Sequence, residues 1–107
     1  MGSVGFLVTK SPSELSFKTF LDLVDIWCEE YLKVYLISNG IYAAMEGNRY
    51  SHTIREISRT GNVFARKEDL MARGITRDML IDGVEVLEGL DSVVVDIMEN
   101  LDMVFTF

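Results

Sequence analysis

Short apolar runs alternate with longer amphipathic stretches along this 107-residue chain, and this alternation limits its fold more than any other feature. The run Val4-Gly5-Phe6-Leu7-Val8-Thr9 is apolar at nearly every position, which is typical of a strand covered on both faces. Strands are predicted over residues 4–9, 33–37, 62–65, 84–87 and 103–107. Because helical stretches separate them, the sequence predicts an α/β fold: a three-layer sandwich with a mainly parallel five-stranded sheet and helices on both faces. We expect residues 1–107 to form a single domain.

The segment after the first predicted strand has the features of a helix start. Ser11 is placed to be the N-cap, Pro12 to occupy the first helical position, and Glu14 to close a capping box. Apolar residues then recur three and four positions apart, which predicts a helix as far as about Tyr31. Further helices are predicted over residues 41–45, 50–58 and 68–73, with a turn at Thr76.

A binding or reaction site is expected at the carboxyl ends of the predicted strands, because ligands of parallel α/β sheets bind there. These ends are residues 9–12, 38–40, 66–67 and 88–90. In the second of them, Ser38-Asn39-Gly40 breaks the strand, and we expect Gly40 to take a positive φ there.

Residues 91–101 carry two conflicting signals. The run Val93-Val94-Val95 favours a strand by its β-branched side chains. Asp91 as a helix cap, followed by apolar residues at helical spacing as far as Leu101, favours a helix. Since a final strand over residues 103–107 follows at once, a helix is predicted.

Net charge argues against direct binding of nucleic acid. Ten basic and 17 acidic residues give a formal charge of −7, whereas non-specific affinity for nucleic acid comes mostly from neutralised phosphates. The charge is uneven: residues 49–77 contain seven basic and three acidic groups, and residues 78–107 contain eight acidic groups and no basic one. A hydrophobic share of 49% excludes a disordered chain. No apolar run approaches the roughly 18 residues of a membrane span and no signal peptide is recognisable, so we expect no membrane association and a cytoplasmic protein.

Cys28 is the only cysteine, so no internal disulfide is predicted. Its thiol could carry a persulfide, and this activity is one alternative function. A reactive thiolate, however, requires a helix N-terminus or cationic neighbours. Cys28 lies instead late in the predicted helix, on its apolar stripe and beside Glu29 and Glu30, and each of these features disfavours the thiolate. A core position is therefore favoured.

His52 is the only histidine, and a metal site would normally need further histidine or cysteine ligands. We therefore expect His52 to be a surface or packing residue and predict no metal site. No Gly-x-Gly-x-x-Gly or phosphate-loop motif follows a predicted strand, which argues against a nucleotide. No cofactor is predicted.

Basic side chains between residues 49 and 77 form the most unusual local feature. They are Arg49, Arg55, Arg59, Arg66, Lys67, Arg73 and Arg77. An ordinary set of solvated helix faces is favoured, and the open alternative is an electropositive edge that docks an acidic surface of another subunit or an anionic sulfur or phosphate group. Arg66 and Lys67 are best placed for that role because they lie just past the third predicted strand.

Three stretches of the chain resemble the DsrE/DsrF/DsrH superfamily, most closely its TusB/DsrH branch. They are Lys10-Ser11-Pro12, Asn39-Gly40-Ile41-Tyr42-Ala43-Ala44-Met45-Glu46-Gly47-Asn48-Arg49-Tyr50 and Glu68-Asp69-Leu70-Met71-Ala72-Arg73-Gly74. The ending Asp102-Met103-Val104-Phe105 is similar to the closing strand of that branch.

The resemblance implies a parallel five-stranded sheet between helices and a subunit of a sulfur-relay sulfurtransferase complex. Such a subunit assembles with DsrE-like and DsrF-like (TusD-like and TusC-like) chains, and the complex passes sulfur as a cysteine persulfide. The TusBCD type serves 2-thiolation of the tRNA wobble uridine, and the DsrEFH type serves dissimilatory sulfur metabolism.

The resemblance also indicates the type of subunit. In catalytic chains of the superfamily the active cysteine lies just after the third strand, where this sequence has Ala65-Arg66-Lys67. The chain therefore resembles a non-catalytic, TusB-like partner, and no functional cysteine is carried over to any position. The candidates for binding a partner or an anion are Asn39, Gly40, Arg49, Arg66 and Lys67.

Association with other chains is also expected from the apolar ending. Residues 103–107 are largely apolar, and the chain has six Met, six Phe, four Tyr and one Trp, which are side chains that suit an interface. At least a dimer is predicted. A stand-alone homo-oligomeric binding module is the alternative to a subunit of a hetero-oligomer.

Overall fold

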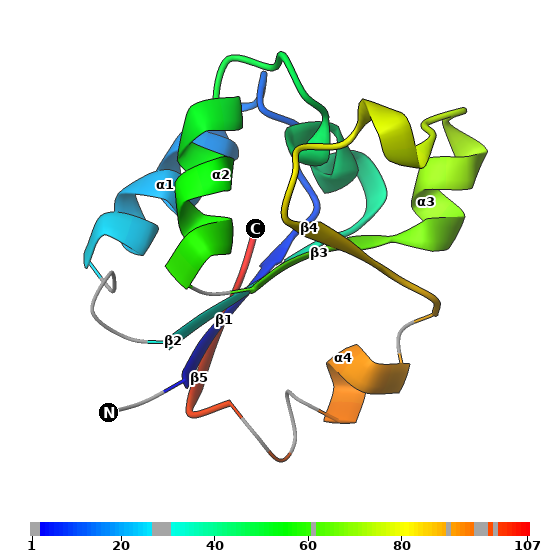
Figure 1. Cartoon of the computed structure of the whole chain (residues 1–107). Coiled ribbons are helices and arrows are strands. Elements are labelled where there is room, and N and C mark those ends of the chain that lie inside the picture. The colour runs from blue at the N-terminus through cyan, green and yellow to red at the C-terminus, as the bar shows by residue number, and fades with distance from the viewer. Residues whose placement is uncertain (1–2, 27–30, 61, 90, 96–98, 100) are drawn as a thin grey trace.

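A computed structural model of the chain describes residues 3–26, 31–60, 62–89, 91–95, 99 and 101–107. Within these residues the strands are β1 (Ser3–Val8), β2 (Tyr31–Leu36), β3 (Asn62–Arg66), β4 (Val84–Leu87) and β5 (Met103–Thr106). They form a five-stranded sheet in the order β4-β3-β2-β1-β5, and every neighbouring pair is parallel (Figure 1). The predicted parallel sheet is confirmed.

Helices connect the strands and cover both faces of the sheet. They are α1 (Leu15–Ile26), the 3₁₀ helix η1 (Ser38–Ala44), α2 (Ser51–Thr60), α3 (Lys67–Ala72), the short 3₁₀ helix η2 (Arg77–Met79) and α4 (Asp91–Val95). Figure 1 shows α1 and α2 on one side of the sheet and α4 on the other. This layering confirms the predicted α/β sandwich.

The main core lies between the sheet and helices α1 and α2. Val4, Phe6 and Val8 alternate along β1 and are all buried on this face. Phe6 meets Phe20 of α1 edge to face, with ring centroids 5.5 Å apart, and stacks on Phe105 of β5 at 5.5 Å. Each fully buried side chain of this size contributes about 1.5–3 kcal/mol, so these contacts fasten α1 and the edge strand β5 to the centre of the sheet.

The opposite face of the sheet carries a smaller apolar layer. Tyr35 of β2 and Phe64 of β3 stack there with ring centroids 5.2 Å apart and an interplanar angle of 14°. Val93 of α4 is buried and lines the same small cavity as Tyr35 and Phe64. The short helix α4 therefore covers the second face.

The first helix is shorter than its sequence predicts. It begins at Leu15 rather than near Ser11, because Ser11 forms a turn in which the carbonyl of Ser11 accepts the N–H of Glu14 at 3.0 Å. The carboxylate of Glu14 accepts the N–H of Ser11 at 2.7 Å, as in a capping box, but the Ser11 hydroxyl pairs with that of Ser13. At the other end, Tyr31 belongs to β2, where it pairs with Ser3 of β1. Helical spacing could not reveal that long-range pairing.

Gly40 does not take the positive φ expected of it. Ser38 takes it instead, at φ 51°, and η1 begins at Ser38, earlier than the helix predicted over residues 41–45. Gly40 is buried against the end of β1, where a Cβ atom would lie 2.1 Å from the carbonyl oxygen of Val8. Glycine is needed here for close approach of two backbones rather than for a left-handed turn.

Helix α4 confirms the choice of helix over strand at Asp91–Val95. Residues 96–98 and 100 of the predicted helix lie outside the described residues. The prediction is wrong at Leu101, which lies outside any helix and packs its side chain over Gly5 of β1, where a Cβ atom would lie 2.5 Å from Cδ1 of Leu101. The missing side chain at Gly5 makes the space for this contact.

Candidate functional site

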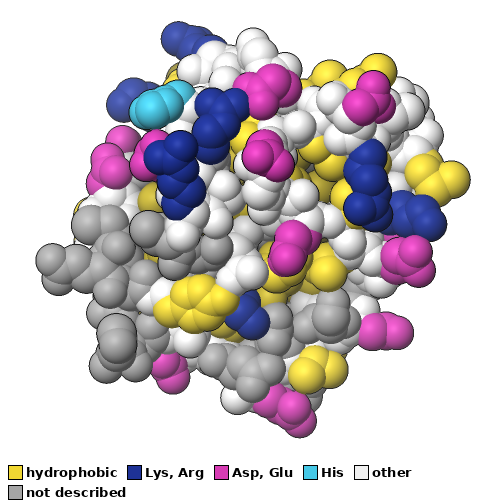
Figure 2. All heavy atoms as spheres, viewed as in Figure 1, with side chains coloured by type: hydrophobic (Ala, Val, Ile, Leu, Met, Phe, Trp, Pro, Cys, Tyr) yellow, Lys and Arg dark blue, Asp and Glu magenta, His cyan; other side chains and the backbone are white. Residues whose placement is uncertain are grey.

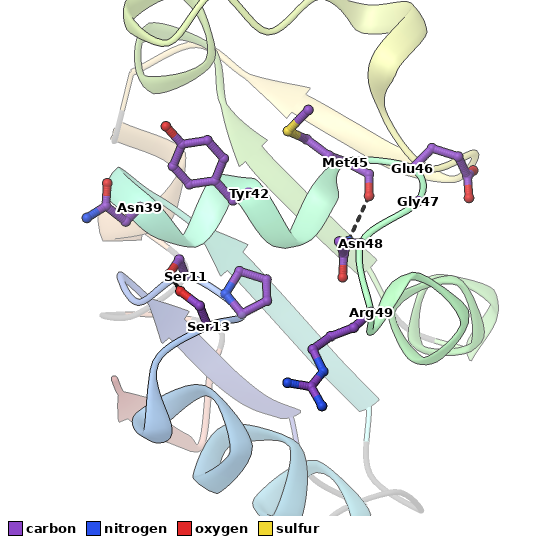
Figure 3. A pocket seen from close by; sticks show the side chains of 10 residues that line it. Ser11, Ser13, Asn39, Tyr42, Met45, Glu46, Gly47, Asn48 and Arg49 are labelled. Carbon is purple, nitrogen blue, oxygen red and sulfur yellow. Dashed lines mark hydrogen bonds between the residues drawn. The ribbon is translucent and has the colours of Figure 1, made fainter.

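An open pocket of about 700 Å³ lies beside the carboxyl ends of β1 and β2 (Figure 3). The loop after β1 forms one wall, and η1 with the turn that follows it forms the other. The lining residues are Ser11, Pro12, Ser13, Asn39, Tyr42, Met45, Glu46, Gly47, Asn48 and Arg49. The volume falls in the usual range for ligand pockets.

Asn48 fixes the turn that carries Arg49 into this pocket. Its side-chain amide donates to the carbonyls of Ala43, at 2.9 Å, and Met45, at 2.7 Å. Its side-chain oxygen accepts the N–H of Tyr50 at 2.7 Å. The chain can reverse here because Gly47 takes φ 88°. The turn therefore holds the backbone of Arg49 in a defined place.

Arg49 brings an uncompensated positive charge to the pocket. Its guanidinium lies over the ring of Tyr50, 5.3 Å from the centroid, and among the described residues no carboxylate pairs with it. Glu46 lines the same pocket, but its carboxylate binds Arg55 of α2, and this contact raises the pKa of Arg55. Figure 3 shows the Glu46 side chain pointing away from that of Arg49.

A second cluster lies at the carboxyl end of β3 and is centred on Asp69 of α3. The Asp69 carboxylate lies 3.4 Å from Nη1 of Arg66 and 3.6 Å from Nη1 of Arg73. It also accepts the backbone N–H of Ser38, the residue with the positive φ, at 2.8 Å. One carboxylate thus compensates two guanidinium groups and ties α3 to the start of η1.

Asn39 connects this cluster to the pocket. Its side-chain oxygen accepts a hydrogen bond from Arg73 at 3.1 Å, and Asn39 also lines the pocket. Arg73 lies over the ring of Tyr42, 5.9 Å from its centroid. The pocket and the cluster therefore share one surface at the carboxyl edge of the sheet.

The structure divides the five sequence-predicted site residues between these two places. Asn39 and Arg49 line the pocket, and Gly40 lies within η1, buried against the end of β1. Arg66 is engaged by Asp69 and by Glu68, whose Oε1 lies 3.6 Å from Nε of Arg66. Lys67 binds Glu88 at 3.1 Å, on the outside of the molecule.

Most of the basic side chains of residues 49–77 are compensated in the same way within the chain. Arg55, Arg59, Arg66, Lys67 and Arg73 form ion pairs. In the part of the chain that the structure describes, Arg49 and Arg77 are the basic residues of this segment that form none. On the face seen in Figure 2, acidic side chains lie close to the basic ones.

Sequence patterns assigned no role to Ser13, Tyr42 and Met45, which also line the pocket. A signal was present, because the stretches 10–12 and 39–50 carry the superfamily resemblance and supply most of the lining. No strand-end pattern could show that these two stretches face each other across one cavity.

Two candidates from the sequence remain, Cys28 and His52. Cys28 lies outside the described residues. His52 is exposed on α2, and within the described residues no group of three or more His, Cys, Asp or Glu side chains is placed to hold a metal ion. No helix in the described part of the chain has both the length and the apolar character needed to cross a bilayer.

Comparison with known proteins identifies the family of this chain and finds solved structures with the same fold. A model of the family described as DsrH like protein matches residues 10–103. The chain belongs to the DsrH-like family. It is 34% identical over 77 residues to the protein named Protein TusB of Shigella flexneri, an alignment that covers 72% of this chain and 75% of that protein.

Two solved structures share the fold of this DsrH-like chain. The protein of unknown function MTH1491 from Methanobacterium thermoautotrophicum superposes with a TM-score of 0.86 at 19% identity, and the ychN protein from E. coli with 0.80 at 22% identity. Each comparison covers 100% of both chains. Family membership supports a role in sulfur relay and confirms the TusB/DsrH branch that the sequence motifs indicated.

Proposed function

We propose that this chain is a non-catalytic subunit of a sulfur-relay sulfurtransferase complex of the TusBCD or DsrEFH type. The observation that carries the proposal is the end of β3. The resemblance to the superfamily puts the active cysteine of catalytic chains there, and this chain has Arg66, held in an ion-pair cluster by Asp69 of α3. That position therefore supports a structural contribution rather than sulfur chemistry.

In such a relay, the thiolate of an acceptor cysteine attacks the terminal sulfur of a donor's persulfide. A new S–S bond forms on the acceptor, and the donor cysteine leaves as a thiolate. Under this proposal both cysteines belong to DsrE-like and DsrF-like partners or to the proteins they serve. The similarity to Protein TusB favours a complex that serves 2-thiolation of the tRNA wobble uridine over one of dissimilatory sulfur metabolism.

Co-expression with the DsrE-like and DsrF-like chains of the same genome tests the proposal. We expect one stable hetero-oligomer by size exclusion with light scattering, and loss of 2-thiouridine from tRNA when the chain is deleted. A chain that remains alone or forms only homo-oligomers in the presence of those partners would contradict a subunit role and favour the stand-alone binding module.

The alternative role of Cys28 as a persulfide carrier has its own test. The complex and its Cys28→Ser variant are incubated with a persulfide donor, and the intact masses of all subunits are measured. We expect no sulfur adduct on this chain and equal transfer by both complexes. Gain of one sulfur atom on folded wild-type chain, with loss of transfer in Cys28→Ser, would make the subunit catalytic.

A further inference from the structure

We infer that the pocket between the loop after β1 and η1 receives a carboxylate-bearing segment of a partner subunit, with Arg49 as the residue that binds the carboxylate. This inference rests on the proposed subunit role and specifies the surface through which that role is exercised. It starts from the unequal use of charge in residues 49–77, where five of the seven basic side chains form ion pairs and Arg49 forms none with the described residues.

The pocket carries the positive charge of Arg49, and none of the described residues supplies a free carboxylate to neutralise it. Glu46 is the acidic residue in its lining, and its carboxylate is bound by Arg55. Arg49 is exposed, and its guanidinium lies over the ring of Tyr50, 5.3 Å from the centroid. A contact with the face of a ring leaves the hydrogen-bond donors of the guanidinium available. A guanidinium in this state binds a carboxylate with two parallel hydrogen bonds.

The walls of the pocket select an apolar group beside that carboxylate. Pro12, from the loop after β1, lines the same pocket as Arg49. Tyr42 and Met45 line it from the side of η1, as Figure 3 shows. Ser11 and Ser13 add two hydroxyls to the wall formed by the loop after β1. These hydroxyls lie 2.9 Å from each other and are further hydrogen-bonding groups. The ligand that fits is an acidic side chain next to an apolar or aromatic one.

The surroundings favour a protein segment over a free small molecule. The pocket is open to solvent, and Tyr42 in its lining is 38% exposed. The backbone of Met79, a residue that is 42% exposed, is joined to the lining, because its carbonyl accepts the N–H of Glu46 at 2.8 Å. Tyr, Met and Arg are the side chains that protein interfaces concentrate.

The test is the affinity of this chain for its co-purified DsrE-like and DsrF-like partners, measured at low and high salt. Arg49→Glu is expected to weaken assembly by about 10- to 100-fold and to reduce its salt dependence. Arg49→Lys, which keeps the charge but loses the fork, is expected to give an intermediate loss. The matched control is Arg77→Glu, which reverses the charge of the other basic residue of this segment that has no ion pair among the described residues and that lies outside this pocket.

Equal loss in Arg49→Glu and Arg77→Glu would overturn the inference, because only net charge would then matter. Unchanged assembly in Arg49→Glu would also overturn it and leave the subunit role intact. If wild-type chain does not assemble at all, the proposed function itself fails, and this inference fails with it. A change confined to self-association would assign the pocket to a second copy of this chain and contradict the inference as stated.

Circular dichroism and thermal unfolding establish that each variant is folded. Tyr42→Ser provides a second, independent probe, since it removes an apolar wall without changing charge. We expect it to weaken assembly by about tenfold at either salt concentration. Full affinity in Tyr42→Ser together with full affinity in Arg49→Lys would exclude the pocket as the contact.

Discussion

The two sites at the carboxyl edge of the sheet use the same residue type in opposite ways. At the end of β3, Arg66 and Arg73 share the carboxylate of Asp69, whose side chain is 16% exposed. In the pocket beside η1, Arg49 has no acidic partner within the described residues. The first arrangement stabilises the fold, whereas the second leaves binding energy for another molecule. A count of basic residues along the sequence cannot separate these two uses.

The comparison also shows what joins the two sites. Ser38, Asn39 and Gly40 form the start of η1: Ser38 donates to Asp69, Asn39 accepts from Arg73, and Gly40 lies against the end of β1. This short segment therefore sets both the ion-pair cluster and one wall of the pocket. Its disruption should affect both sites together.

The largest effect is expected for Gly40→Ala. Its Cβ would lie 2.1 Å from the carbonyl oxygen of Val8, so η1 must move away from β1, at a cost of about 3 kcal/mol or more. Gly47→Ala is the matched control: no atom lies within 4 Å of its Cβ, and only its φ of 88° is strained, which costs about 1–2 kcal/mol. Urea denaturation measures both. A smaller loss in Gly40→Ala than in Gly47→Ala would show that η1 is not fixed against β1.

Asp69→Ala should give the next largest effect. It leaves two half-buried guanidinium groups and the N–H of Ser38 without their carboxylate, which costs about 2–3 kcal/mol. Glu56→Ala breaks the exposed pair with Arg59 on α2 and is expected to cost at most about 0.5 kcal/mol. Equal free energies of unfolding in these two variants would contradict a structural role for the cluster.

Arg73→Ala and Arg49→Ala compare the two sites by removing one arginine from each and measuring the loss of stability. Arg73 donates to Asn39 and to the carbonyl of Asp69, so its loss should cost about 1–2 kcal/mol of stability. Arg49→Ala should lower stability by at most about 0.5–1 kcal/mol, because the contact with Tyr50 is what Arg49 loses among the described residues. Thermal unfolding of the isolated chain decides the matter. A large loss in Arg49→Ala would mean that its charge already serves the fold.

Much of the fold could be predicted because its signals are local. Each predicted strand was found within a few residues of its expected place, and the choice of helix at residues 91–95 was correct. Two of the errors came from contacts between distant residues: Tyr31 joins β2 by pairing with Ser3, and Leu101 packs over Gly5 instead of continuing the helix. Periodicity within a window of sequence contains no information about either partner.

The candidate site was less predictable for the same reason. The strand-end rule located Asn39, Arg66 and Lys67, but it could not show that Arg66 and Lys67 are bound by Asp69 and Glu88. Such pairing depends on which acidic residues the fold brings near each cation, and Lys67 and Glu88 are 21 positions apart in sequence. Whether a basic side chain at a site is paired with a carboxylate is therefore a property of the tertiary structure.

The smallest effect is expected for Glu68→Gln, through the pH dependence of stability. Hydrogen bonds from its own backbone N–H and from that of Gly89, 3.0 Å away, lower the pKa of Glu68. A carboxylate whose pKa is lowered by folding stabilises the native state above its unfolded pKa of about 4.3, and this contribution is lost as pH falls through the folded pKa. Wild type should therefore be slightly more stable than Glu68→Gln at neutral pH, and the difference should disappear under acidic conditions. Urea midpoints measured across that range test this, and a difference that grows on acidification would contradict the assignment. Glu68 belongs to the ion-pair cluster at the end of β3 and does not line the pocket. The same substitution should therefore leave assembly with partner subunits unchanged.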